Sequence, residues 1–462
     1  MNPELLRNLW LQFSPHRIIA APLILGAVFA LAAFATDSWE VVGSAAAGAY
    51  AVIAYLWGTR RAVNVLADEI AAGTWDGQRM SSIDPWTMAW GKLLGGTSYV
   101  WYCALFSLAT YAAAEIESGR GSALAVNLPI KITGALLAQA TALLLVLVLV
   151  GKGRRLSRRT VAFAQGGALL VGIFGVTSVL LPSLTERLGF GVVDKITWFG
   201  FVFPSSDFTL LTQVLFLGWA VAAVYRLMAG ELQVRQQPWV WLSFTLFLIL
   251  YDQGLLVLGR NDALSLRLLP ALLAAIPLYY LALFAQSNDI IRYRWLSHHL
   301  RRANWRNVFS LLPLWVPSLL VAAALSIVVA MLAKSDMQSL ADVERVARIW
   351  DAPMPSGNLA TAIALILFML RDLGIVLLIN FAKRPQASDL AAILYLIVLY
   401  GICGGLVAAA GATSLLPLFW PGVGRSASVV VLAPFIEVIL VAFLLQRRWA
   451  AQSRALQLRP AA

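Results

Sequence analysis

The chain of 462 residues is 60% hydrophobic and only 13% charged, and it contains 17 Trp. Soluble domains carry roughly a quarter charged residues, so this composition excludes an ordinary soluble protein and indicates a polytopic membrane protein. The net charge is +12, but the basic residues gather at the ends of apolar runs, which favours membrane topology over nucleic-acid binding. The two cysteines, Cys103 and Cys403, lie inside apolar runs, so neither a disulfide framework nor a metal cluster is predicted.

The N-terminal segment is polar before the first apolar run. Asn2, Pro3 and Glu4 are typical of a helix cap, a first-turn proline and an acid that complements the helix dipole. Apolar residues then recur at helical spacing, which predicts an amphipathic helix lying in the membrane interface. These apolar residues are Leu5, Leu6, Leu9, Trp10 and Phe13.

The apolar runs predict an all-α fold with about twelve membrane spans, since each crossing needs about twenty apolar residues. A second polar, basic helix is expected over residues 288–302, in front of the ninth span. Residues 182–208 leave room for a re-entrant segment. The predicted spans are 18–36, 42–58, 93–114, 128–150, 161–181, 209–229, 238–258, 268–286, 308–332, 359–382, 390–410 and 427–445.

The distribution of Lys and Arg predicts the orientation. When the N-terminus is placed inside, most of the 35 basic residues fall in inner segments, so both termini are expected in the cytoplasm. Basic segments recur before the first and ninth spans, which suggests two halves related as parallel repeats, residues 1–286 and 287–462. The alternative is one asymmetric bundle without a repeat.

A conspicuous polar segment, residues 68–86, separates the second and third spans. Gly73 suits a helix end in the left-handed conformation, Ser82 or Asp84 suits the cap of the next helix, and Pro85 suits a first helical turn. The segment therefore predicts a helix, a break, a short helix and a second break at the ends of two spans.

The pattern Glu69-x-x-x-Gly73-Thr74-x-Asp76, followed by Pro85 and Gly91-Lys92, resembles the type-2 ABC transporter permease family over roughly residues 60–95. In that family this stretch lies in the first cytoplasmic loop and docks on a separate ATP-hydrolysing subunit. The resemblance implies the membrane-spanning subunit of an ATP-binding cassette exporter, with two permease-like halves fused and the coupling loop at residues 60–92. The residues that it assigns to coupling are Glu69, Gly73, Thr74, Asp76, Arg79, Pro85 and Lys92.

No residue pattern predicts covalent chemistry. The phosphate-loop motif Gly-x-x-x-x-Gly-Lys-Ser/Thr is absent, so ATP is expected to bind to the partner subunit and no cofactor to this chain. His16, His298 and His299 form neither a spaced ligand pair nor a nucleophile with its base. We expect a transport subunit rather than an enzyme. The expected partners are an ATP-binding cassette subunit, membrane lipids and an unidentified substrate. The expected location is a cell membrane, the bacterial inner membrane.

Four charged residues fall inside predicted spans: Asp252, Arg371, Asp372 and Glu437. Charges at this depth are costly and need a partner or a water-filled path. Arg371 can pair with Glu437 or Asp252 as a structural contact between helices, or these residues can line a route for substrate or protons. A third interpretation places Arg371 and Asp372 at the end of a helix that extends beyond the bilayer.

Two other classes of function remain open from the sequence. An ion-gradient-driven secondary transporter would use Asp252, Asp372 or Glu437 as coupling groups, and about twelve spans suit it equally. An integral membrane enzyme acting on lipid-linked sugars needs clustered carboxylates or His in a large outer loop. The large outer segments, residues 182–208 and 334–358, contain no His and only scattered acids.

Overall fold

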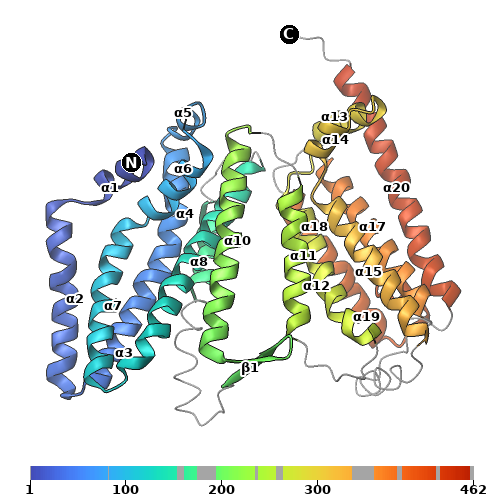
Figure 1. Cartoon of the computed structure of the whole chain (residues 1–462). Helices are drawn as coiled ribbons and strands as arrows, with labels where there is room; N and C mark the ends of the chain where they lie inside the picture. The colour runs from blue at the N-terminus through green and yellow to red at the C-terminus, as the bar shows by residue number, and fades with distance from the viewer. Residues whose placement is uncertain are drawn as a thin grey trace. The chain divides into compact units, whose positions relative to one another are not determined.

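The computed structural model describes residues 2–81, 83–152, 161–173, 194–234, 238–255, 264–335, 358–381, 388–422 and 427–457. Over these residues the chain is helical apart from one hairpin of two strands, β1 (Lys195–Trp198) and β2 (Phe201–Pro204). Figure 1 shows long helices along most of the chain. The prediction of an all-α fold is confirmed for the described residues, apart from this hairpin.

The protein is a helical multi-pass membrane protein. Among the described residues, nine helices are long and apolar enough to cross a membrane. The predicted spans coincide with described helices except for the ninth, which is interrupted near Pro313, and the fifth, of which only residues 161–173 are described. Two other helices at predicted spans are not among the nine, because α7 (Ser98–Glu117) is less apolar and α11 (Trp239–Gly254) is shorter than a full crossing requires. The total of twelve therefore stays a prediction.

The chain divides into two compact units. Unit 1 comprises residues 1–196 and 201–236, and unit 2 comprises residues 197–200 and 237–462. This division lies earlier in the chain than the predicted boundary between residues 286 and 287, because α11 packs against α12 (Leu264–Ala285) in unit 2. Whether each unit is a permease-like half stays a prediction.

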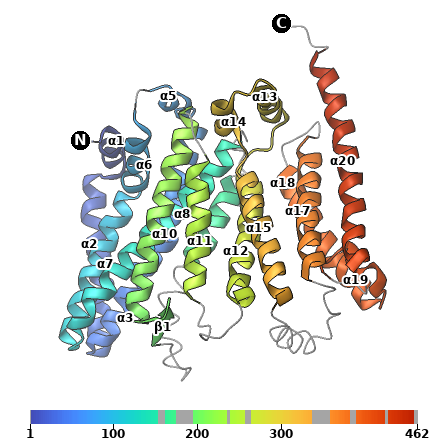
Figure 2. The same cartoon turned by 45° about the vertical axis from the view of Figure 1, so that its right-hand side comes forward.

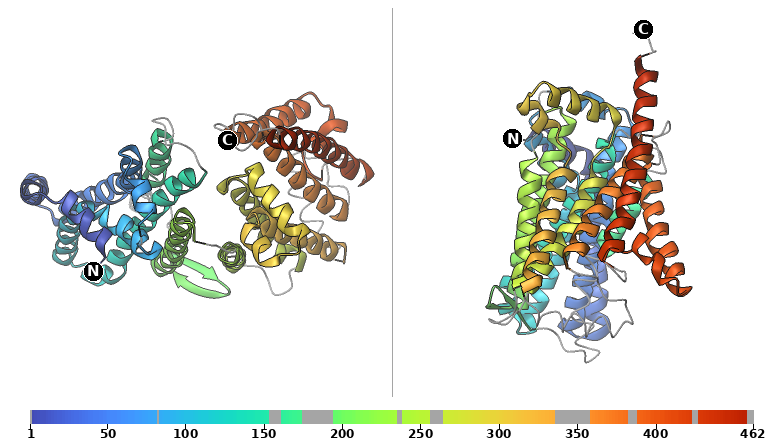
Figure 3. Two further views of the ribbon diagram at one scale, coloured as in Figure 1. Left: turned by 90° about the horizontal axis from the view of Figure 1, so that it is seen from above. Right: turned by 90° about the vertical axis from the view of Figure 1, so that its right-hand side faces the viewer.

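In unit 1 the long helix α8 packs along α4 and α10. The core of unit 1 contains Leu66, Leu143, Leu147 and Met228, all fully buried. The segments α1, α5 and α6 gather at one end of the unit, and α1 lies across the long helices (Figures 1 and 3). Further elements of unit 1 are α1 (Pro3–Gln12), α2 (Pro15–Thr36), α3 (Trp39–Tyr50), the π-helix η1 (Ala51–Trp57), α4 (Gly58–Ala71), α5 (Trp75–Arg79), α6 (Pro85–Trp90), the π-helix η2 (Gly91–Gly95), η3 (Gly121–Ala123), α8 (Leu124–Gly151) and α10 (Ser205–Glu231).

In unit 2, α17 packs against α20 and α15, and α12 packs against α15 (Figure 2). The buried aromatic residues Tyr279, Phe368 and Phe381 belong to this core. Further elements of unit 2 are α13 (Ile290–Arg301), α14 (Trp305–Leu311), α15 (Trp315–Ser335), α17 (Asn358–Asn380), α18 (Ser388–Ile397), the π-helix η5 (Val398–Cys403), α19 (Gly404–Ala409), η6 (Thr413–Leu418) and α20 (Ala427–Gln457).

The start of the predicted ninth span, residues 308–332, is wrong. Its first residues belong to α14, and the following helix α15 begins only at Trp315. Leu312 is extended (φ −58°, ψ 125°), as expected for a residue that precedes a proline, here Pro313. The predicted polar helix at residues 288–302 is present as α13.

Candidate functional site

The polar segment folds as its local sequence predicts. Helix α4 ends at Ala71, and Gly73 takes a left-handed φ of +71°. The Asp84 carboxylate accepts hydrogen bonds from the backbone N–H of Trp86 (2.9 Å) and of Thr87 (3.2 Å), so Asp84 caps α6. Ser82, the other candidate cap, lies outside the described residues. The predicted coupling loop, residues 60–92, begins inside helix α4, which continues to Ala71. The connection between α4 and α6 is therefore shorter than the predicted loop.

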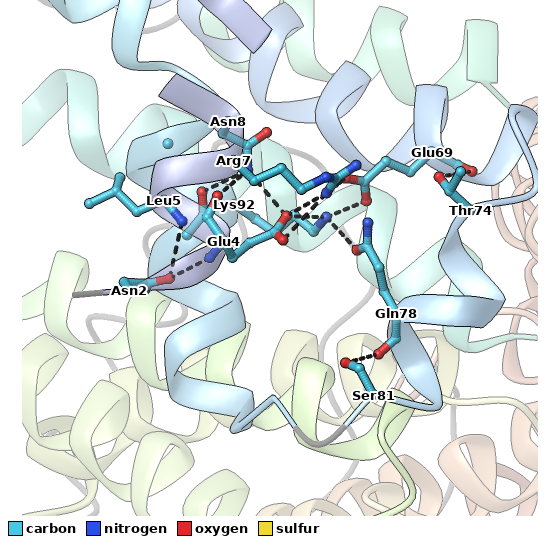
Figure 4. A network of polar contacts seen from close by, with 12 residues as sticks. Asn2, Glu4, Leu5, Arg7, Asn8, Glu69, Thr74, Gln78, Ser81 and Lys92 are labelled. Atoms are coloured by element: carbon cyan, nitrogen blue, oxygen red, sulfur yellow. Dashed lines mark hydrogen bonds and ion pairs between the residues drawn. The ribbon is translucent and has the colours of Figure 1, made fainter. Parts of the chain in front are cut away.

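Lys92 is the centre of a buried polar network at this end of unit 1 (Figure 4). Its side chain is fully buried, and its Nζ lies 2.8 Å from Glu4 Oε1 and 2.8 Å from Gln78 Oε1. Lys92 also forms an ion pair with Glu69. Glu4 and Glu69 are themselves buried, at 2% and 8% exposure. One lysine therefore joins α1, α4 and α5 to η2.

Arg7 balances the charge of the network. Its Nη1 donates to Glu69 Oε1 (2.8 Å) and to Glu4 Oε1 (3.1 Å). Burial by itself lowers the pKa of Arg7, but the hydrogen bond to Glu69 and the charges of Glu4 and Glu69 outweigh it, so the pKa is raised. Two carboxylates thus face two cations, an arrangement that buried charges require because an unpaired charge in the interior is strongly destabilising.

Helix α1 contacts unit 1 through a buried polar stripe, beside which Leu5 lies close to Gly95. Glu4, Asn8 and Gln12, four residues apart, are buried, whereas Trp10 and Leu11 are 84% and 66% exposed. Gln12 Nε2 donates to the carbonyl of Gly95 at 2.7 Å, and Asn8 Nδ2 lies 3.3 Å from the carbonyl of Gly91. The sequence analysis missed this contact, although the i, i+4, i+8 spacing of the three polar residues carried the signal.

Two glycines of η2 let α1 approach closely. A Cβ at Gly91 would lie 2.6 Å from the Cβ of Glu4, and a Cβ at Gly95 would lie 3.0 Å from the Cβ of Asn8. A side chain at either position would push α1 away. The pair Gly91-Lys92 therefore combines close contact with charge pairing.

Gly91→Ala is expected to loosen α1 by moving Glu4 out of reach of Lys92. Amide hydrogen exchange of α1 should become at least about tenfold faster, corresponding to a loss of about 1–3 kcal/mol for overpacking. Gly77→Ala is the matched control, because nothing lies within 4 Å of a Cβ at Gly77. Equal exchange rates in Gly91→Ala and wild type would contradict the close contact.

The predicted coupling residues divide by the direction they face. Glu69 and Lys92 point inward, and Arg79 Nε donates to the carbonyl of Glu231 in α10 at 3.2 Å. Thr74 is exposed, and the Asp76 side chain is 83% exposed. Gly73 takes the left-handed conformation after α4, and Pro85 is the first residue of α6. The outward face also includes Met80, at 86% exposure, which the sequence analysis did not select.

A second buried cluster lies in unit 2, in the span formed by α17. Arg371 Nη1 donates to Glu437 Oε2 in α20 at 2.6 Å and to the carbonyl of Leu418 in η6 at 3.0 Å. Arg371 Nε donates to Asp372 Oδ1 at 3.1 Å. Arg371 thus pairs with Glu437, one of its two predicted partners. The other, Asp252 in α11, takes no part in these bonds.

Tyrosines complete the surroundings of Asp372. The hydroxyls of Tyr280 in α12 and Tyr400 in η5 each donate to Asp372 Oδ2 at 2.6 Å. The guanidinium of Arg371 also lies over the ring of Phe368 at 4.3 Å and near that of Tyr400 at 5.1 Å. One Arg–Asp pair therefore connects α12, α17, η5, η6 and α20.

Comparison with protein-family models, with curated proteins and with solved structures gives no match. Over the part of the chain that the structure describes, no group of three or more His, Cys, Asp or Glu is placed to hold a metal ion. The candidate functional features are the two polar clusters and the exposed face of α5.

Proposed function

We propose that this protein is the membrane-spanning subunit of an ATP-binding cassette exporter, which moves an unidentified substrate with ATP hydrolysed by a separate nucleotide-binding subunit. The observation that carries the proposal is the short helix α5, held between two breaks and fixed to the adjacent spans by the buried Lys92 network. A helix that is exposed on one side and rigidly attached on the other is suited to receive motion from a partner.

The contacts of α5 provide a physical route for that motion. Gln78 in α5 binds Lys92 in η2, and Lys92 in turn pairs with Glu69 in the last turn of α4. Arg79 adds a contact to α10 through Glu231. Because packed helices move as rigid elements, pressure on α5 would shift α4, η2 and α10 together.

The proposed topology has about twelve spans, parallel halves and both termini in the cytoplasm of a bacterial cell. It places α5 inside and the connection after α7 outside. In a chain in which Ser replaces Cys103 and Cys403, a thiol reagent that cannot cross the membrane should label Glu117→Cys in intact cells but not Met80→Cys. The reverse labelling pattern would contradict this orientation.

The partner is tested at the exposed face of α5. The double variant Asp76→Arg/Met80→Glu should remove at least nine tenths of the ATPase activity that purifies with the wild-type protein in mild detergent. Interface contacts of this kind are worth about 2 kcal/mol or more, which is over tenfold in affinity. Both side chains point outward, so the thermal unfolding midpoint should stay unchanged.

The control for this experiment is Glu40→Ala/Arg120→Ala, which removes an exposed ion pair of 2.7 Å between α3 and the connection after α7. The control should keep the associated ATPase. Absence of any ATPase from the wild-type preparation, or full ATPase retention in the double variant, would count against the proposal.

The alternative is a secondary transporter driven by an ion gradient. The buried Arg371 and Asp372, together with the half-buried Glu437, favour it, because ionisable groups within spans often mark ion or proton routes. Substrate uptake into vesicles that contain only this protein, dependent on an ion gradient and independent of ATP, would establish the alternative and reject the exporter.

A further inference from the structure

An open groove of about 400 Å³ lies between α6 and α10 of unit 1, next to the polar segment. Its lining residues are Asp84, Trp86, Ala222 and Tyr225. The rings of Trp86 and Tyr225 meet edge to face, with centroids 5.1 Å apart. Both rings remain accessible, at 42% and 38% exposure. The groove therefore presents two aromatic rings to a ligand.

The groove also presents a negative charge. Asp84 is exposed, and both of its cap hydrogen bonds end on Oδ2, so Oδ1 can accept from a ligand. No lining residue is basic. A carboxylate beside exposed indole and phenol rings attracts cations, since the ring faces carry negative electrostatic potential. The carboxylate and the ring faces repel an anionic group and attract an ammonium group.

The position of the groove suggests where that ammonium group comes from. Tyr225 lies in the last two turns of α10, about 9 Å along the axis before Glu231. The opposite wall begins at Asp84, where α6 starts. Trp and Tyr at the end of a span lie at the level of the lipid headgroups. The groove therefore lies at the level of the headgroup layer on the side of α5.

We propose that this groove binds the ammonium headgroup of phosphatidylethanolamine from the leaflet on the side of α5. The ammonium lies against Trp86 and Tyr225 and donates a hydrogen bond to Asp84. The site does not depend on ATP or on a partner subunit, so its failure would leave the proposed transport function untouched. The bound lipid headgroup lies against α6, at the end of the same polar segment.

The experiment compares lipids that the purified protein retains. The full chain is reconstituted into nanodiscs of equal phosphatidylethanolamine and phosphatidylglycerol, extracted in mild detergent, and the retained lipids are counted by mass spectrometry. Wild type should enrich phosphatidylethanolamine. Asp84→Asn should reduce the enrichment about threefold, as expected for the loss of one exposed cation contact. Asn also caps helices well, so α6 should stay folded.

Two further variants sharpen the result. Trp86→Leu should reduce the enrichment to a similar extent, whereas Asp68→Asn, which neutralises an exposed carboxylate away from the groove, should not. Ethanolamine hydrochloride added during extraction should displace the lipid, because its ammonium group can both lie against the two rings and donate a hydrogen bond to Asp84. Equal retention in wild type and Asp84→Asn, or enrichment of phosphatidylglycerol, would overturn the proposal. Retention of the lipid in excess ethanolamine would overturn recognition by the ammonium.

Discussion

Replacing Lys92 with Met is expected to lower the stability of unit 1 by about 3–5 kcal/mol, the usual cost of removing one partner from a buried ion pair. Among the described residues, Arg7 alone would remain to balance the buried Glu4 and Glu69. The measurement is the midpoint of thermal unfolding in detergent, which should fall by several degrees. Release of α1, seen as rapid hydrogen exchange, should accompany the fall.

A second substitution separates charge from packing. Adding Glu4→Gln to Lys92→Met leaves Arg7 and Glu69 as a balanced pair, so most of the lost stability should return. Arg61→Met is the surface control, since its pair with Asp68 at 3.7 Å is exposed and contributes at most about 1 kcal/mol. An unchanged unfolding midpoint in Lys92→Met would show that the network does not hold α1.

Replacing Arg371 with Met should have an effect of similar size in unit 2. Asp372 in α17 and Glu437 in α20 would lose the cation that they share, and both helices are apolar enough to span the membrane. The expected cost is again about 3–5 kcal/mol. The measurements are the yield of folded protein from membranes and its thermal unfolding midpoint, and both should fall.

The triple variant Arg371→Met/Asp372→Asn/Glu437→Gln removes all three charges and should recover the yield. If the cluster is a structural contact between helices, this variant keeps transport; if the cluster is an ion route, the variant folds but loses transport. Arg448→Met is the control, because the partner of Arg448 among the described residues is a neutral acceptor, the carbonyl of Leu378, at 2.8 Å. A normal yield of Arg371→Met would contradict the predicted cost.

Local sequence rules predicted the parts of the fold that depend on near neighbours. The cap by Asp84, the left-handed Gly73 and the first-turn prolines Pro3 and Pro85 follow from backbone chemistry within a few residues. Apolar runs located the long helices for the same reason. The break at Pro313 was also visible in the sequence, but the apolar residues on either side of it suggested a continuous span.

The parts that could not be predicted depend on contacts between distant residues. Lys92 meets Glu4, 88 residues earlier in the chain, and Tyr280 meets Asp372, 92 residues later. No local pattern specifies such pairs. The face of α1 that is buried against the protein was not predicted either, because it satisfies carbonyl groups and a lysine instead of filling an apolar core.

The close approach of α1 to η2 restricts how this protein can vary. A larger residue at position 91 has no room while Glu4 occupies that space, and without Lys92 the buried Glu4 and Glu69 share the single cation Arg7. Single substitutions at these sites therefore pass through less stable intermediates, whereas coordinated changes avoid them. Across related sequences, positions 4, 69, 91 and 92 should co-vary as one set.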